Sequence, residues 1–124
     1  MPRKFNGDTL VLATHNKGKI AELRDMIGGR VPHLLTAAEL GLPEPPETGT
    51  TFTENAMIKA STAAKLCKFP VLAEDSGLCI TALNGAPGVY AADWAGHPRN
   101  FRAAIHRVLA DMDGATDRSA YFQT

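Results

Sequence analysis

Apolar and polar residues alternate along the chain in blocks that predict strands and helices in turn. Short apolar runs typical of strands occupy residues 9–13, 33–36, 69–73, 78–83 and 119–123. Apolar residues at helical spacing predict helices over residues 20–27, 52–67 and 99–112. Loops rich in Pro and Gly are expected at 39–51 and 84–88. This order of strands and helices predicts an α/β fold.

Composition limits the class of protein without naming a function. The 124 residues suit one domain, and 13 basic against 13 acidic side chains argue against a polybasic nucleic-acid or membrane binder. No apolar run is long enough to span a bilayer, and residues 1–9 lack the apolar stretch of a signal peptide. Cys67 and Cys79 form no C-x-x-C motif, so both are expected to be small buried residues in a reducing cytoplasm.

The first candidate site is the polar turn between the predicted strand at 9–13 and the helix that follows. A helix start offers free backbone N–H groups and a partial positive charge, which suit a phosphate. Lysines, a threonine and an asparagine add charge and hydrogen-bonding capacity to this turn, whose residues are Thr14, His15, Asn16, Lys17, Gly18 and Lys19. The spacing of a Walker loop is absent. An ordinary strand–helix turn with solvated lysines is the alternative.

The second candidate is Glu74-Asp75-Ser76-Gly77, at the end of an apolar strand. Ligand sites in α/β sheets favour the carboxyl ends of strands, and adjacent carboxylates there need a partner or a cation. Asp75 could hold Mg²⁺, orient a water molecule, or both. In the alternative interpretation, Asp75 and Ser76 cap backbone groups in a turn. Ser76 does not lie in the G-x-S-x-G motif of a nucleophile elbow, which leaves a Ser–His–Asp hydrolase unsupported.

Two further segments carry charged groups that could complete such a site. Glu44 and Glu47 lie in the Pro-rich loop and could add a carboxylate to a metal site, although loop carboxylates are usually solvated. On the following helix, Asn55 and Lys59 lie one turn apart and could point at one ligand, or form a polar helix face. Glu54 suits the negative charge favoured at a helix start. None of the four histidines has metal-ligand spacing to another His or Cys.

Four segments taken together are more specific than any one of them. In order they are L-A-T-H-N-K-G-K-I-A-E-L, E-T-G-T-T-F-T-E-N-A-M-I-K-A, L-A-E-D-S-G-L and L-N-G-A-P-G-V-Y-A-A-D-W-A-G. Across nearly the whole chain, the sequence closely resembles the inosine/xanthosine triphosphate pyrophosphatase family, and its bacterial branch in particular.

The resemblance implies hydrolysis of ITP, dITP and XTP to the monophosphate and pyrophosphate, with Mg²⁺ as cofactor, in a homodimer. It also implies a mixed, elongated α/β sheet flanked by helices, with a nucleotide cleft between two lobes. By position, residues 14–19 match the triphosphate-binding turn, with Asn16 and Lys19 as its main contacts, and Ser76 matches a substrate-binding position. Asp75 matches the proton acceptor and metal ligand, and Glu47 or Glu44 matches the second metal-binding carboxylate. His15 stands where many members of the family have Gly.

Members of this family are roughly half as long again or more, in the range of larger single-domain proteins. We therefore expect residues 1–124 to be one truncated domain that lacks a C-terminal part for base recognition. The helix at 99–112 and the strand after it should then expose apolar surface, which favours oligomers. A catalytically incomplete nucleotide-binding module and a dimerisation fragment are the alternatives to an active enzyme.

Overall fold

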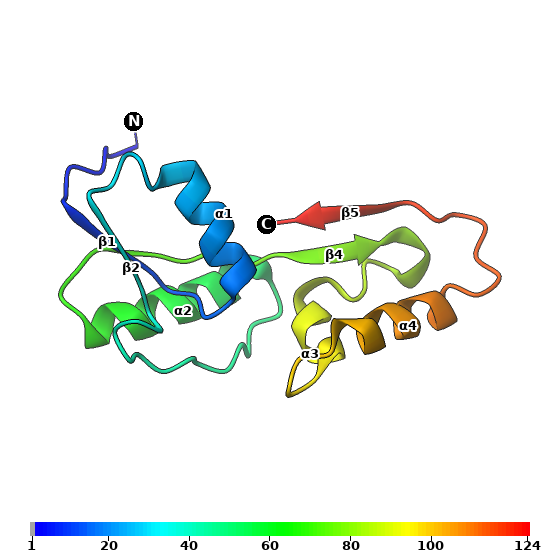
Figure 1. The fold of residues 1–124 in the computed structure, drawn as a ribbon. Helices are drawn as coiled ribbons and strands as arrows, with labels where there is room; N and C mark the ends of the chain where they lie inside the picture. The colour runs from blue at the N-terminus through cyan, green and yellow to red at the C-terminus, as the bar shows by residue number, and fades with distance from the viewer. Residues whose placement is uncertain (1) are drawn as a thin grey trace. The chain divides into compact units, whose positions relative to one another are not determined.

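The computed structural model describes residues 2–124, which divide into two compact units. The described residues up to Gly49, with Thr53–Glu74, form the first unit, and Thr50–Phe52 with Asp75–Thr124 form the second. The first unit contains β1 (Thr9–Leu12), α1 (Lys17–Ile27), β2 (His33–Thr36), α2 (Phe52–Leu66) and β3 (Val71–Leu72). The second contains β4 (Gly77–Ile80), the 3-10 turns Thr81–Leu83 and Gly88–Tyr90, α3 (Ala91–Ala95), α4 (Phe101–Asp111) and β5 (Ala120–Gln123). Figure 1 shows this order of elements.

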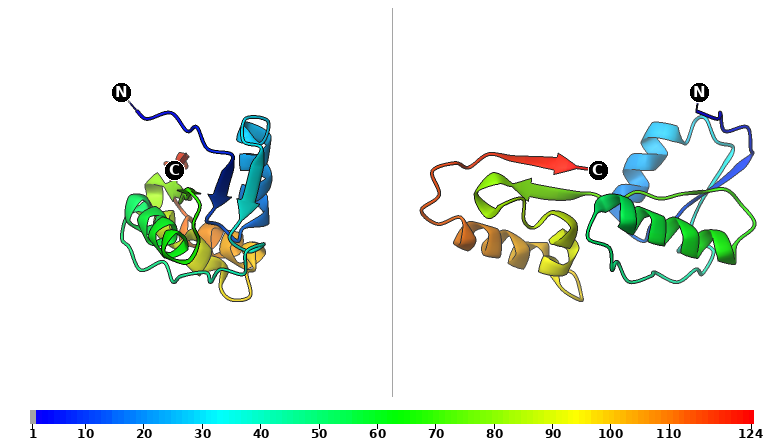
Figure 2. Two further views of the ribbon diagram at one scale, coloured as in Figure 1. Left: turned by 90° about the vertical axis from the view of Figure 1, so that its left-hand side faces the viewer. Right: turned by 180° about the vertical axis from the view of Figure 1, so that it is seen from behind.

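The first unit is built on a three-stranded parallel sheet with β1 at its centre. The strand order is β2-β1-β3, with Leu12 opposite Thr36 on one side and Leu72 on the other. Val11 and Leu12 are fully buried, as the continuous apolar run predicts for a strand covered on both faces. The chain crosses from β1 to β2 and then back past β1 to β3. Right-handed crossovers in opposite directions put their helices on opposite faces, and α1 and α2 lie on different sides of β1 (Figure 2).

The second unit pairs β4 with β5 in an antiparallel ladder, in which Gly77 faces Gln123 and Ile80 faces Ala120. Cys79 and Ile80 on β4 are buried, whereas every residue of β5 is exposed. Just before β5, the Asp117 carboxylate accepts hydrogen bonds from the hydroxyl and the backbone N–H of Ser119. The bond from the hydroxyl, followed by the bond from the N–H, lowers the pKa of the exposed Asp117 carboxyl.

The predicted exposure of the last helix and strand is confirmed. Phe101, Ile105 and Leu109 follow one another at intervals of four residues on α4 and are each more than half exposed. On β5, Phe122 is 82% exposed. Large apolar groups on adjacent turns and on an exposed strand form the kind of surface that proteins usually cover.

Several predicted boundaries were wrong for local reasons. The extended segment predicted at 78–83 ends at Ile80, because the chain turns through a 3-10 turn to Asn84, whose φ is 53°, in the left-handed region. The strand predicted at 69–73 is reduced to Val71–Leu72. Helix α3 was not predicted, since five residues are too few to show a periodic pattern. Cys79 is buried as expected, but Cys67 is only half-buried because α2 has already ended at Leu66.

Among residues 2–124, no helix combines the length and apolar character that crossing a bilayer requires.

Gly77 is needed where β4 passes the 3-10 turn at Gly88. A Cβ at position 77 would overlap the carbonyl oxygen of Gly88 and come within 3.2 Å of the Phe52 ring. We expect Gly77→Ala to lower the free energy of unfolding by about 1–3 kcal/mol, the usual cost of forcing an extra methyl group into a packed site. Urea denaturation measures this change.

Gly29→Ala is the matched control, because nothing lies within 4 Å of its added Cβ. Its effect should stay within about 0.5 kcal/mol, as for most exposed positions. Equal stability of both variants would show that the Gly77–Gly88 approach is not a packing constraint.

Candidate functional site

The turn after β1 is folded by its own side chains. The backbone N–H of Ala13 donates to the Leu72 carbonyl of β3 at 2.9 Å, which continues the sheet one residue beyond β1. Thr14, which is 6% exposed, accepts a hydrogen bond at Oγ1 from the N–H of Asn16. The turn is therefore held at the carboxyl end of the central strand, where α/β sheets place their ligands.

Asn16 is the N-cap of α1. Its Oδ1 accepts hydrogen bonds from the N–H groups of Gly18 at 2.9 Å and Lys19 at 3.2 Å. These are two of the donors that a helix start leaves without intrahelical partners. Asn16 already satisfies them, so an anion at this turn would rely on the Asn16 side-chain NH₂ group and the lysines rather than on those two amides.

Lys19 forms an ion pair with Glu74 across the carboxyl ends of two neighbouring strands. Its Nζ lies 2.7 Å from Glu74 Oε1, and both side chains are about three-quarters buried. Glu74 follows β3, and Lys19 lies in the first turn of α1, which follows β1. The chain goes from β1 to β2 and then back past β1 to β3, so the strand order reverses between β1 and β3, and this is the switch point of the sheet.

The two polar residues noted on the second predicted helix are buried inside the first unit. Asn55 is 1% exposed and Lys59 is 7% exposed. Asn55 Oδ1 accepts the N–H of Gly49 at 2.8 Å, and Lys59 Nζ lies 3.2 Å from Glu47 Oε1. A buried lysine is costly without a partner, so this pair fixes Glu47 beside α2. Of the two alternatives that the sequence left open, the structure contradicts an exposed polar helix face, because both residues are buried.

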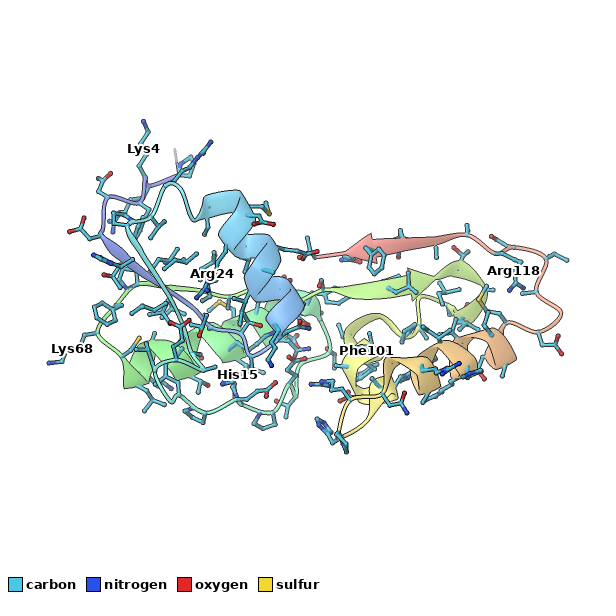
Figure 3. The ribbon with its side chains drawn as sticks, viewed as in Figure 1. Lys4, His15, Arg24, Lys68, Phe101 and Arg118 are labelled. Carbon is cyan, nitrogen blue, oxygen red and sulfur yellow. The ribbon has the colours of Figure 1, made fainter. Side chains whose placement is uncertain are left out.

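The two candidate loop carboxylates differ in their surroundings. Glu44 is exposed, whereas Glu47 is half-buried against Lys59. At the other end of the same loop, His15 Nε2 donates to the Leu42 carbonyl at 3.1 Å. Figure 3 labels His15, which lies between β1 and α1. The structure thus connects the turn at 14–19 to the acidic loop.

Asp75 and Ser76 belong to the second unit, immediately before β4. Asp75 is 6% exposed, and its backbone carbonyl accepts a hydrogen bond from the Thr124 hydroxyl at 3.4 Å. Ser76 is half-buried. Within residues 2–124, no three His, Cys, Asp or Glu side chains gather as a ready-made metal site.

Sequence reasoning did not predict the contacts of three polar residues, namely Glu74, Asn55 and Lys59. The strand-end position of Glu74 and the four-residue spacing of Asn55 and Lys59 were visible in the sequence. Their partners Lys19, Gly49 and Glu47 were not, because each contact depends on the tertiary fold.

These features define an α/β protein with a cationic turn and the Glu74 carboxylate at the switch point of its parallel sheet. Residues 10–124 match the family model described as Ham1 family, and the chain belongs to that family.

The relatives are bacterial proteins longer than this chain. It is 52% identical over 117 residues to the dITP/XTP pyrophosphatase of Rhodospirillum centenum, which covers 94% of this chain and 58% of that protein. With the dITP/XTP pyrophosphatase of Caulobacter vibrioides the identity is 48%, over 94% of this chain and 60% of the relative. A solved HAM1 protein from Coxiella burnetii is 41% identical and superposes with a TM-score of 0.80, covering 92% of this chain and 59% of that one. The chain thus spans somewhat under two thirds of these relatives.

The capping role of Asn16 makes a stability prediction that is independent of any ligand. Asn16→Ala should lower the free energy of unfolding by about 1 kcal/mol, because it removes the N-cap. Asn16→Asp keeps an acceptor oxygen and adds a negative charge at the helix start, so it should match or exceed the wild type. Thermal or urea denaturation of the three proteins checks this order, and an alanine variant as stable as the wild type would contradict the cap.

Proposed function

We propose that the chain forms the phosphate- and metal-binding part of a pyrophosphatase that acts on non-canonical purine nucleoside triphosphates. The reaction would convert ITP, dITP or XTP to the monophosphate and pyrophosphate. The main support is the turn at 14–19, where Lys19 lies beside Glu74 at the switch point of the sheet. The relatives of this chain bear the name dITP/XTP pyrophosphatase.

Cationic and hydrogen-bonding groups of the turn would bind the triphosphate. Lys17 and Lys19 supply positive charge, and the NH₂ group of Asn16 supplies a donor that the cap leaves unused. His15, Gly18 and Thr14 shape the turn, and Ser76 would add a hydroxyl to the substrate. In the ligand-free protein, Glu74 offsets the charge of Lys19, so an incoming phosphate competes with a carboxylate.

The proposed cofactor is Mg²⁺, and the available donors suit it. Mg²⁺ prefers oxygen ligands and usually needs only one or two protein carboxylates, with water and substrate phosphates completing its coordination. Asp75 and Glu47 would supply these carboxylates, and Glu44 is the exposed alternative to Glu47. When bound, the metal would neutralise phosphate charge and polarise the reacting phosphoryl group.

Asp75 would act as the general base. Its carboxylate would accept a proton from water as the water oxygen forms a bond to the α-phosphorus. The bond from the α-phosphorus to the bridging oxygen breaks, and pyrophosphate leaves with that oxygen. The lysines of the turn would stabilise negative charge on the transferring and departing groups.

We infer a cytoplasmic homodimer built from single domains, with no nucleic-acid or membrane partner. The exposed apolar residues of α4 and β5 support association with other protein surface. Because the chain spans 58% of the Rhodospirillum relative, a nucleotide-binding module without turnover is the second candidate function.

Pyrophosphate release tests the proposal directly. The 124-residue protein is incubated with ITP, dITP and XTP, and separately with ATP and GTP, with and without Mg²⁺. Selective release that depends on Mg²⁺ would support the enzyme. Folded protein that binds nucleotide without releasing pyrophosphate would favour the binding module, and protein that does neither would leave only a structural role.

Asp75→Asn separates catalysis from binding. The amide keeps the shape of the carboxylate but cannot accept a proton, so turnover should fall at least about 100-fold, in line with the loss of a general base. Nucleotide affinity measured by calorimetry without Mg²⁺ should change little. Asp113→Asn, at an exposed position after α4, is the matched control. Near-normal turnover in Asp75→Asn would remove this residue from the catalytic role.

The Lys19–Glu74 pair predicts opposite effects from its two partners. Lys19→Ala should weaken binding of inorganic pyrophosphate roughly tenfold, the value of one hydrogen bond between charged groups, and should weaken triphosphate more than monophosphate. Glu74→Gln removes the competing carboxylate and should tighten binding. Calorimetry measures both, with exposed Lys68→Ala as control. Equal losses for triphosphate and monophosphate in Lys19→Ala would argue against contact with the triphosphate tail.

A further inference from the structure

The acidic loop, residues 42–49, is held at both ends by side chains from outside it. At its start, the carbonyl of Leu42 accepts a hydrogen bond from His15 Nε2 at 3.1 Å. At its end, the N–H of Gly49 donates to Asn55 Oδ1 at 2.8 Å, and Glu47 pairs with Lys59 at 3.2 Å. The loop is therefore attached to the turn after β1 on one side and to α2 on the other.

The prolines of the loop make its position depend on these attachments. Three of its residues are proline, namely Pro43, Pro45 and Pro46. Proline fixes its own φ and has no N–H, so this stretch is stiff but can form few backbone hydrogen bonds of its own. A stiff segment without a regular hydrogen-bond pattern takes its position from the groups that hold its ends.

The attachment at Gly49 is close-packed. A Cβ at position 49 would come within 2.7 Å of Asn55 Oδ1 and 2.6 Å of the Glu54 Cβ. At Leu42 the N–H donates to the Ala37 carbonyl at 2.9 Å, whereas the carbonyl is held by one imidazole from a segment 27 residues away. Because a carbonyl oxygen only accepts, Nε2 must carry the proton, as it does in one neutral tautomer and in the imidazolium.

We propose that His15 is a positioning residue that holds the acidic loop against the phosphate-binding turn. It would keep Glu47 and Glu44 within reach of the ligand that the turn binds. His15 would act through the loop, so its loss should affect the metal-dependent part of binding and leave the capped turn intact. The consequence for metal binding rests on the proposed function, but the attachment of the loop does not.

Hydrogen exchange resolved by NMR tests the attachment. His15→Leu keeps the bulk of the side chain and removes the donor, whereas His15→Gln retains an N–H at the end of a side chain of similar reach. In His15→Leu, the backbone amides of residues 44 and 47–49 should exchange about threefold to tenfold faster, the range expected for one lost hydrogen bond. His15→Gln should restore rates close to the wild type.

Amides outside the loop provide the internal control. Those of Gly18 and Lys19 are held by the Asn16 cap, so their exchange should not change in either variant. His106→Leu, on the exposed face of α4, should leave the loop unaffected. Wild-type exchange throughout the loop in His15→Leu would overturn the proposal, as would equal acceleration of the loop and the capped amides. Should His15→Leu fail to fold, His15→Ser, which is too short to reach Leu42, provides the same comparison.

Calorimetric titration with inorganic pyrophosphate, with and without Mg²⁺, tests the functional consequence. We expect His15→Leu to reduce the gain in affinity that Mg²⁺ provides several-fold and to weaken metal-free binding by less. Loss of metal-free binding to the same degree would mean that His15 serves the turn rather than the loop, against the proposal. If the wild type binds no pyrophosphate, the proposed function fails, and the exchange rates still decide whether His15 holds the loop.

Discussion

Burial of β1 between two parallel neighbours is the constraint on which the first unit depends. Val11 and Leu12 have no access to solvent, and the strand pairs with β2 on one side and β3 on the other. The chain can satisfy both pairings only by crossing over twice in opposite directions, which creates the switch point at the carboxyl ends of β1 and β3. The polar turn and Glu74 lie at that point because they directly follow these strands.

Two buried or partly buried lysines of the first unit form ion pairs with carboxylates. Lys19 is paired with Glu74 and Lys59 with Glu47. Each pair joins segments far apart in the sequence, one at the ends of two strands and the other between α2 and the Pro-rich loop. The groups proposed to bind phosphate and metal thus also hold the ligand-free site together, and this double use links the stability of the loop to the chemistry of the site.

The parts of the fold that the sequence predicted are those whose signal is local. The apolar run of β1, the turn after it and the apolar spacing of α4 were recognisable without any partner. On α2, regularly spaced alanines indicated an apolar inner face, yet the buried residues include Asn55 and Lys59. Their burial depends on Gly49 and Glu47, which lie in a loop without periodicity, so no pattern could reveal it. The five-residue α3 was missed for the opposite reason, since its own signal is too short.

Pairing of Lys19 with Glu74 has a kinetic consequence. The whole chain carries equal numbers of acidic and basic side chains, and the charge of Lys19 is offset by a carboxylate 2.7 Å away. A distant polyanion therefore meets little net field from the Lys19–Glu74 pair, and electrostatic steering by this pair would add little to its rate of association. The attraction grows only when an anion is small enough to approach the turn and replace Glu74 at the ammonium. Long nucleic acids gain nothing from such a site at a distance, whereas a compact polyphosphate gains from it on contact.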